Sequence, residues 1–461
     1  MSIRQISCRA ALVSALWLLG APPAAAQNTA TTVQLPTFGV AVDADGLLTL
    51  KTYPDPTGRL TMERITAARR QLSQDLLAAS PLRKVSLVRL EAAVRRRLEA
   101  GQEPDPAMCN LAGLVRLKCV FFYPETNDVV IAGPAEGWAE DLSGRVRGIA
   151  SGRPVLELED LVVALRAFAP NGRGTPFVGC TIDPTPEAMQ RLGQFTRRIP
   201  SVVPERQRGA VGVQIAQGMR EALGLAPIRV FGVPADTHFA RVLVEADYRM
   251  KLIGIGLEPP PVKMASYLDL LRNNAPMQRW WFTPNYECVK VTGDRLGMEL
   301  VGEGVQLLSE SQLVGPDGQF RSGAPANKAS ELFTAGFTRK YPELAARSPV
   351  FAQLRNLIDM TIAAAFIRQQ DYYNRAGWTM PLWGDEGRFP VRNRPAPGHV
   401  AAAVNATWKG SRLIALAGGG VSIRPAEAFA SGRVADDEDG RLAGLRSDVK
   451  RAMPDDRWWW D

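Results

Sequence analysis

Two segments of the chain share one strand-to-helix plan, and this plan constrains the fold more than any other feature. In the first, a β-rich run at 177–182 leads into a helical run at 187–198, and in the second, 228–233 leads into 239–250. Asp and Thr residues between strand and helix can accept hydrogen bonds from the free N–H groups of the helix's first turn. Such units build sheets covered by helices, and ligands often lie beyond the carboxyl ends of the strands. We therefore expect a pocket near these turns, although helix capping alone also explains the residues.

Strand patterns and helix patterns alternate along the rest of the chain. A hairpin is expected across 115–132, a β-meander across 279–309, a long buried helix across 349–375 and a second hairpin across 401–423. These patterns predict an α+β or mixed α/β fold with one large central unit.

Composition shifts along the chain suggest six segments. They are a signal peptide at 1–26, a loose arm at 27–60, a helical pair at 61–101, a central domain at 102–376, a β-containing extension at 377–434, and a tail at 435–461 that ends in three tryptophans. The tail is expected to be poorly ordered unless these tryptophans dock on the fold.

The beginning of the chain has the pattern of a cleavable secretory signal. Arg4 and Arg9 precede an apolar run at 10–19. The small residues at 24–26 suit a signal peptidase and place the mature start at Gln27. We therefore expect an exported protein, periplasmic or secreted, with an uncleaved anchor as the alternative.

No anchor is expected in the mature chain. Cys8 lies upstream of the apolar run and would be removed with the signal, so it cannot carry a lipid. No later apolar run approaches the ~18 residues that a membrane-spanning helix needs, the best being 360–367. We expect no transmembrane segment after cleavage.

The charge balance argues against a nucleic-acid partner. The net charge is +8, and loss of the two signal arginines lowers it to +6, which is too dilute for a basic binding face. The densest basic cluster, 95–97, shares its helix with Glu91 and Glu99. We interpret it as a solvated face, with attraction to an anionic envelope surface as a second choice.

Four cysteines remain after signal removal, and an even count in an oxidising compartment suggests two disulfide bonds. We favour Cys109–Cys119, which closes a short loop, and Cys180–Cys288. Four buried thiols are the alternative.

Histidine scarcity excludes several kinds of site. Only His238 and His399 are present, so a three-histidine zinc site and an HExxH motif are impossible, and we expect no metal and no cofactor. The only thiol–imidazole arrangement would pair Cys180 or Cys288 with His238, and a disulfide would abolish it. We interpret His238 as a first-turn helix residue beside Thr237.

Carboxylate chemistry needs no histidine. Glu157 with Asp160, or Glu245 with Asp247, could support glycoside hydrolysis if the two carboxyl groups faced each other at the right separation. Acidic residues are scattered along the whole chain, so these pairs identify no catalytic residue.

Charged pairs at four-residue spacing mark the helical run at 241–251, namely Arg241–Glu245, Glu245–Arg249 and Asp247–Lys251. Such pairs are typical of a solvated helix face. In a functional interpretation, Arg241 and Arg249 would instead clamp an anionic ligand.

Aromatic clusters at 280–282 and 458–460 could stack on sugars or dock on a partner, although we favour core filling for the first. The candidate binding residues are Trp138, Asp236, Arg241, Asp247, Arg249, Trp280 and Trp281.

Several longer motifs resemble one known family. They lie at 129–138, 151–156, 161–166, 180–185, 233–237, 244–252 and 280–282. Over about residues 111–374 the chain resembles an uncharacterised family of exported bacterial proteins, known only as a domain of unknown function. The resemblance implies export and one large shared unit, and it implies no catalytic residue.

Together these patterns favour a non-enzymatic envelope or secreted module that binds a partner protein or a glycan. The alternative is a carboxylate-dependent hydrolase of the glycoside hydrolase type. Two facing acids in a cleft would favour the enzyme, and a shallow aromatic groove would favour binding.

Overall fold

The computed structural model describes residues 37–42, 48–172, 174–200, 202–273, 277–310, 327–409 and 411–461. All of them belong to one compact unit, Pro36–Asp461. The expected signal peptide and its cleavage point lie outside the described residues. The described part of the expected loose arm is regular, because β1 (Thr37–Val42) pairs antiparallel with β2 (Leu48–Tyr53).

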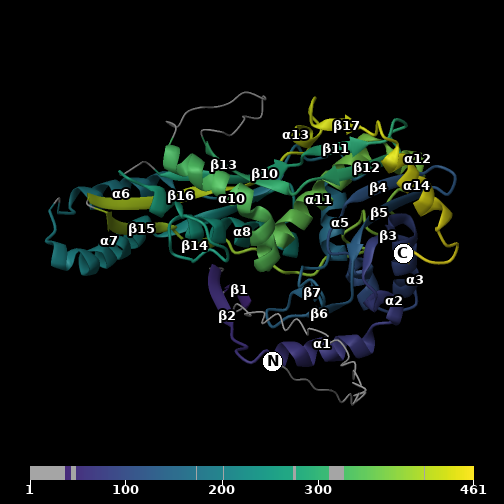
Figure 1. Ribbon diagram of the computed structural model, residues 1–461, viewed down its shortest axis with the longest axis horizontal. Helices are drawn as coiled ribbons and strands as arrows, with labels where there is room; N and C mark the ends of the chain where they lie inside the picture. Colours follow the sequence, from purple (N-terminus) through teal and green to yellow (C-terminus); the bar gives the residue numbers. More distant parts are fainter. Residues whose placement is uncertain are drawn as a thin grey trace, which may run out of the picture. The chain divides into compact units, whose positions relative to one another are not determined.

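Two seven-stranded mixed sheets form the framework of this unit (Figure 1). The first has the order β13 (Gly304–Ser309), β10 (Gln278–Asn285), β16 (Ser411–Ile423), β8 (Val178–Ile182), β9 (Leu225–Phe231) and β14 (His399–Ala401), and β15 (Val404–Lys409) pairs with β16. The second has the order β17 (Val434–Asp436), β11 (Cys288–Val291), β12 (Gly297–Val301), β4 (Cys119–Tyr123), β5 (Asp128–Ala135), β3 (Ser80–Ser86) and β18 (Trp459–Trp460). A separate ribbon joins β6 (Trp138–Glu140) to β7 (Val146–Gly148).

Helices occupy much of the remaining chain. They are α1 (Arg59–Gln71), α2 (Gln74–Leu77), α3 (Leu87–Glu99), α4 (Pro106–Cys109), α5 (Leu158–Ala167), α6 (Pro186–Arg197), α7 (Arg208–Leu223), α8 (His238–Gly254), α9 (Tyr267–Leu270), α10 (Lys328–Arg347), α11 (Pro349–Gln369), α12 (Tyr372–Arg375), α13 (Pro425–Ala428) and α14 (Arg441–Arg451), with short 3₁₀ turns η1 (Leu111–Gly113) and η2 (Glu205–Gln207). The α+β class is confirmed, with a helical N-terminal region and a strand-rich C-terminal part.

Both predicted strand-to-helix turns are present, at β8–α6 and β9–α8. Thr185 and Thr237 cap their helices by accepting from the backbone N–H groups of Ala188 and Ala240. However, β8 and β9 are antiparallel neighbours. The carboxyl end of β8 therefore lies beside the amino end of β9. The two turns lie at opposite ends of these strands and do not form one common pocket.

The four strands expected between 279 and 309 form, but they do not pair as a meander. β11 and β12 form a hairpin in the second sheet, whereas β10 and β13 pair with each other in the first. Along the chain, the β11–β12 hairpin thus lies between β10 and β13, which pair with each other in the first sheet. Period-two patterns identify strands but leave their partners open.

The glycine run in β16 shows how closely the central strands of the first sheet approach one another. A Cβ atom on Gly420 would lie 1.9 Å from the backbone oxygen of Cys180. Gly419 has a φ of 109°, in the left-handed region. The glycine run thus lies where β16 passes between β8 and β10.

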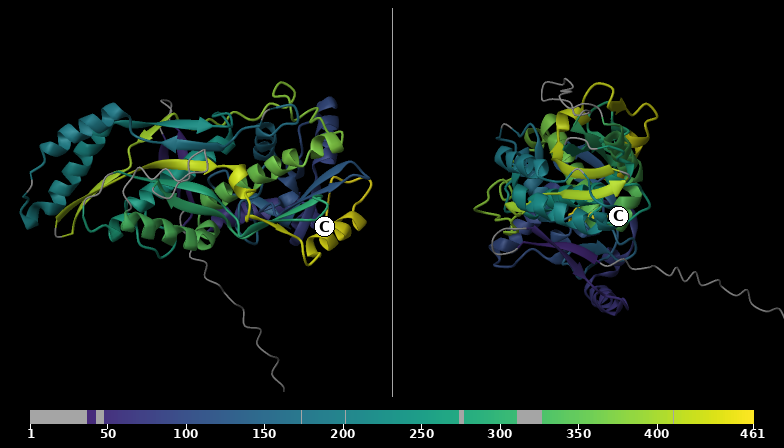
Figure 2. Two further views of the ribbon diagram at one scale, coloured as in Figure 1. Left: turned by 90° about the horizontal axis from the view of Figure 1, so that it is seen from above. Right: turned by 90° about the vertical axis from the view of Figure 1, so that its left-hand side faces the viewer.

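The ends of the unit differ from expectation. The expected helical pair contains an additional strand, β3, which joins the second sheet. The C-terminal tail is ordered, because Trp459 and Trp460 pair with the edge of β3 and the side chain of Asp461 binds Arg83. In the left-hand view of Figure 2, α14 lies in yellow beside the strands of this sheet.

Helix α11 is long and apolar enough to cross a membrane, with a mean hydropathy of 1.4 over its most apolar window. Length and composition alone do not make this helix a membrane span, so the expected absence of a transmembrane segment stays a prediction. All of that window is buried inside the fold. The helix also carries buried polar groups, among them Asp359, which binds Arg116 at 3.0 Å.

The two expected disulfide bonds are absent, and Cys109, Cys119, Cys180 and Cys288 are free thiols. Cys180 lies on β8 in the first sheet and Cys288 on β11 in the second, so they do not meet. Cys119 packs in a small core cluster with Phe121 and Leu442, and the thiol of Cys109 donates to the backbone oxygen of Pro104 at 3.6 Å. Spacing along the chain could not reveal these different surroundings.

Candidate functional site

Helix α8 has no solvated face. Phe239 and every residue from Val242 to Gly254 are buried, including the four charged residues Glu245, Asp247, Arg249 and Lys251. The prediction of surface ion pairs on this helix is therefore wrong. Period-four charge spacing is shared by solvated helices and by central helices whose charges pair internally, so the pattern could not separate the two.

Each buried charge on α8 has a partner. Arg145 binds Glu245 at 2.5 Å, and Arg249 binds Glu258 at 2.6 Å. Lys251 Nζ lies 2.7 Å from Asp247 Oδ2 and also donates to the backbone oxygens of Ile182 and Gly419, at 3.0 and 3.1 Å. The two backbone hydrogen bonds of Lys251 connect α8 to β8 and β16. Burial of these charges without partners would cost several kcal/mol per ion.

Most of the candidate binding residues have structural roles. Trp280 is fully buried and donates from Nε1 to Ser330, and Trp138 is buried against Gly113. Arg249 is committed to Glu258, and Asp247 to Lys251. Neither tryptophan can contribute to a surface aromatic groove.

The remaining candidates are more accessible. Trp281 is half-buried, with the guanidinium of Arg279 5.5 Å above its ring. Arg241 is half-buried and Asp236 is exposed. Arg249 binds Glu258 and is therefore not available to bind an anion together with Arg241.

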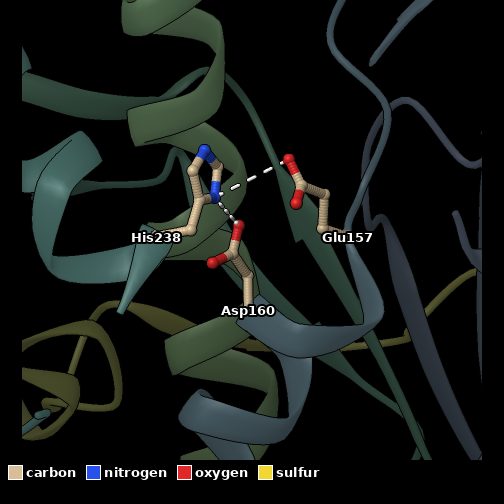
Figure 3. Close-up of side chains that lie close together, drawn as sticks. All are labelled: Glu157, Asp160 and His238. Atoms are coloured by element: carbon tan, nitrogen blue, oxygen red, sulfur yellow. Dashed lines mark hydrogen bonds and ion pairs between the residues drawn. The ribbon is translucent and has the colours of Figure 1, made fainter. Parts of the chain in front are cut away.

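A different group of side chains meets where the N-termini of α5 and α8 lie close together. Glu157 precedes α5, Asp160 lies in its first turn, and His238 is the first residue of α8 (Figure 3). His238 Nδ1 lies 2.8 Å from Asp160 Oδ2 and 3.7 Å from Glu157 Oε1. One donor atom from each of the three residues lies within 4.8 Å of the others.

Figure 3 shows both carboxylates directed at the same ring nitrogen, while Nε2 points away from them. The side chains are largely buried, with His238 13% and Glu157 14% exposed. Asp160 Oδ1 is buried and has no hydrogen-bond partner in the described structure. The group therefore retains unused acceptor capacity.

Electrostatics couple the three residues. Burial disfavours a charged imidazole, but the carboxylates of Asp160 and Glu157 outweigh it and raise the pKa of His238 to about 9. Burial also raises the pKa of Asp160, although the positive charge of His238 opposes this.

A segment without regular structure, 383–398, lies beside this group and supplies two arginines. Arg394 Nη1 is 3.1 Å from Glu157 Oε2, and the Arg394 backbone N–H donates to the backbone oxygen of Asp236 at 2.7 Å. Arg392 lies 3.4 Å from Glu159. These contacts orient Glu157, as the residues that surround a ligand set often do.

The sequence singles out each of the three residues, but it does not indicate that they form one group. Glu157 and Asp160 stood out as one carboxylate pair among several, and His238 as a first-turn residue beside Thr237. Seventy-eight residues separate Asp160 from His238. Only the packing of α5 against α8 brings them together, and no local sequence spacing predicts this contact.

Part of the chain that includes His238 matches a known protein family. Residues 180–267 match the family model described as "Protein of unknown function (DUF1598)". This match confirms the resemblance to an uncharacterised family over that segment, which contains α8 and His238, and the family description assigns no activity. No curated protein and no solved structure matches the chain.

Proposed function

We propose that the chain is an exported protein, periplasmic or secreted, that binds a divalent transition-metal ion through Glu157, Asp160 and His238. The convergence of one imidazole nitrogen and two carboxylate oxygens is the observation that carries this proposal. It replaces the expectation, drawn from histidine scarcity, that the protein has no metal site.

The donor set suits such an ion in chemistry and in size. Imidazole together with carboxylate is a ligand set for Zn²⁺, Mn²⁺ or Fe²⁺, whereas Ca²⁺ and Mg²⁺ prefer oxygen donors alone. Ligands about 2.1 Å from one ion lie about 3 to 4 Å apart. The separations of 2.8 and 3.7 Å from His238 Nδ1 are close to these values.

The surrounding groups also hold the two carboxylates in place. Glu159 and Asp160 lie in the first turn of α5, where the helix dipole favours negative charge. Arg394 leaves Oε1 of Glu157 facing His238 while it holds Oε2. The ion would supply a fixed positive charge with open coordination positions for water or for a partner's donor groups, and the chain would bind without catalysis.

Titration calorimetry of the purified chain with Zn²⁺ and Mn²⁺ tests the proposal. We expect one site, and we expect His238→Ala and Asp160→Asn each to weaken binding at least about tenfold, since each loses a direct ligand. His399→Ala is the matched control, because His399 is the other histidine and is exposed on β14. Equal binding by the wild type and His238→Ala would refute the site.

A carboxylate-dependent hydrolase is the second candidate, because one acid pair now has a defined geometry. The donor oxygens of Glu157 and Asp160 lie within 4.8 Å, and burial raises the pKa of Asp160 as a proton donor requires. Metal-independent cleavage of a glycan that Asp160→Asn abolishes would favour this function over metal binding.

A further inference from the structure

A cavity of about 180 Å³ lies on the fold outside the His238 site. One wall is the face of α3 that carries Val88, Glu91, Ala92 and Arg95, and the other is the segment 376–381. Gly377 and Thr379 are exposed at its rim, so the cavity opens to solvent. Its volume is below that of drug-sized ligand sites and suits a ligand of monosaccharide size.

Glu91, on α3, binds the segment that forms the second wall. Its side chain is buried, which corrects the expectation that it belongs to a solvated face of α3. One carboxylate oxygen accepts the backbone N–H groups of Leu382 and Trp383, at 2.8 and 2.7 Å. The other accepts the indole N–H of Trp378. A buried acid whose negative charge is shared by three N–H groups fixes this segment against α3.

The backbone of this segment is also held in an unfavourable conformation. Met380 has a φ of 53°, and Asp371, just before α12, has a φ of 56°. A left-handed conformation at a non-glycine residue costs about 1 to 3 kcal/mol and persists only where the surroundings enforce it. Met380 lies between Trp378 and Leu382, two of the residues that bind Glu91, so these contacts hold the strained backbone in place.

Arg95 determines what the cavity can bind. Its side chain is 42% exposed, and it is paired only loosely with Glu99, at 3.8 Å. The carboxylate of Glu91 makes its hydrogen bonds to the N–H groups of Trp378, Leu382 and Trp383, which partly offset its negative charge next to Arg95. A guanidinium in this setting matches a carboxylate geometrically, with two parallel hydrogen bonds.

We propose that this cavity binds a small carboxylate of monosaccharide size, either a free organic acid or the uronic-acid unit of a glycan. Arg95 would bind the carboxylate, and Val88, Ala92 and Pro381 would contact the body of the ligand. This site is independent of the metal site, so either can fail without the other.

Binding of glucuronate to the full purified chain, followed by calorimetry or by ligand-observed NMR, tests the proposal. We expect saturable binding that Arg95→Gln weakens at least about tenfold, because a charge-assisted hydrogen bond is lost. Ala92→Phe should abolish binding by filling the cavity while all charges are kept. Arg96→Gln is the matched control, since Arg96 is the exposed neighbour that does not line the cavity.

The remaining outcomes are also decisive. If glucose binds as well as glucuronate, or if Arg95→Gln and Ala92→Phe both bind like the wild type, the proposal is wrong. No saturable binding of glucuronate or of a polyuronate also overturns it. Retention of the polyuronate alone identifies a glycan-borne carboxylate, whereas equal affinity for the free acid identifies a small organic acid. Circular dichroism of each variant shows that the fold is kept.

Discussion

Asp247 is a carboxyl group without access to solvent, 2.7 Å from the ammonium group of Lys251. Burial raises the pKa of Asp247 from about 3.8 to about 6, although Lys251 opposes the shift. Between these two values the folded chain holds a proton that the unfolded chain has lost. The contribution of this proton to stability is therefore complete below about pH 4 and is lost as the pH rises through 6.

We expect Asp247→Asn to remove this pH dependence. The variant should be less stable than the wild type overall, because Lys251 loses its counter-ion. Between pH 4 and 6, however, the free energy of unfolding of the wild type should fall by up to about 3 kcal/mol relative to the variant. Urea unfolding at several pH values measures this difference.

Asp236→Asn is the control for this experiment, since Asp236 is exposed on the loop before α8. It should reproduce the pH dependence of the wild type. Parallel pH profiles for the wild type and Asp247→Asn would show that Asp247 does not titrate in this window.

At the scale of elements, the last strand shows how the C-terminus is held. Arg83 on β3 is fully buried, and its guanidinium binds both carboxylate oxygens of Asp461, at 2.9 and 2.8 Å. The ring of Trp459 lies 4.9 Å from the same guanidinium. An ion pair, a cation–π contact and strand pairing thus act together on a short segment.

Deleting residues 458–461 should destabilise the chain by about 3 kcal/mol or more, because it leaves the guanidinium of Arg83 buried without a carboxylate. Denaturant unfolding measures the loss. Arg451→Gln is the control, since Arg451 forms an exposed pair with Asp448 on α14 and should contribute less than about 1 kcal/mol. A truncated chain as stable as the wild type would mean that the tail does not dock.

Helix α8 carries the element-scale lesson about prediction. Its position, its Thr237 cap and its length to within a few residues followed from periodicity and capping chemistry. Its buried environment did not follow from the sequence. Charged residues at every second position lie on all sides of the helix, and each of them needs a different partner. Those partners, such as Arg145 and Glu258, lie on other elements.

At the scale of the whole molecule, the thiols connect structure with export. Cys119 and Cys180 are buried in the core, and burial raises the pKa of Cys119 to about 12. Cys109 and Cys288 are half-buried. The buried thiols are therefore protected from reagents as well as from oxidation.

For protein purified from an exporting host, we expect a mass that begins at Gln27 and four free thiols after unfolding without reductant. In the native state, Cys109 and Cys288 should react with a thiol reagent well before Cys119 and Cys180. A chain that keeps Met1 and five thiols would contradict export, and a mass deficit from oxidised thiols would contradict the free cysteines.

Local physics made part of this protein predictable from its sequence. Period-two and period-four patterns, proline and glycine positions and helix caps depend on neighbours within a few residues. They therefore located the hairpin of β4 and β5, the helices α3, α8 and α11, and both strand-to-helix turns. The expected signal peptide at 1–26 lies outside the described residues and stays a prediction.

Only the tertiary structure decided which of these pieces meet. It inserted β16 between β8 and β10, divided four consecutive strands between two sheets, kept the cysteines apart, buried the charges of α8 and brought His238 to Asp160. Such contacts join residues tens to hundreds of positions apart, and their free energy depends on burial and on partner groups that no local pattern contains. The elements therefore follow from the sequence, whereas both proposed binding sites follow from the way those elements pack.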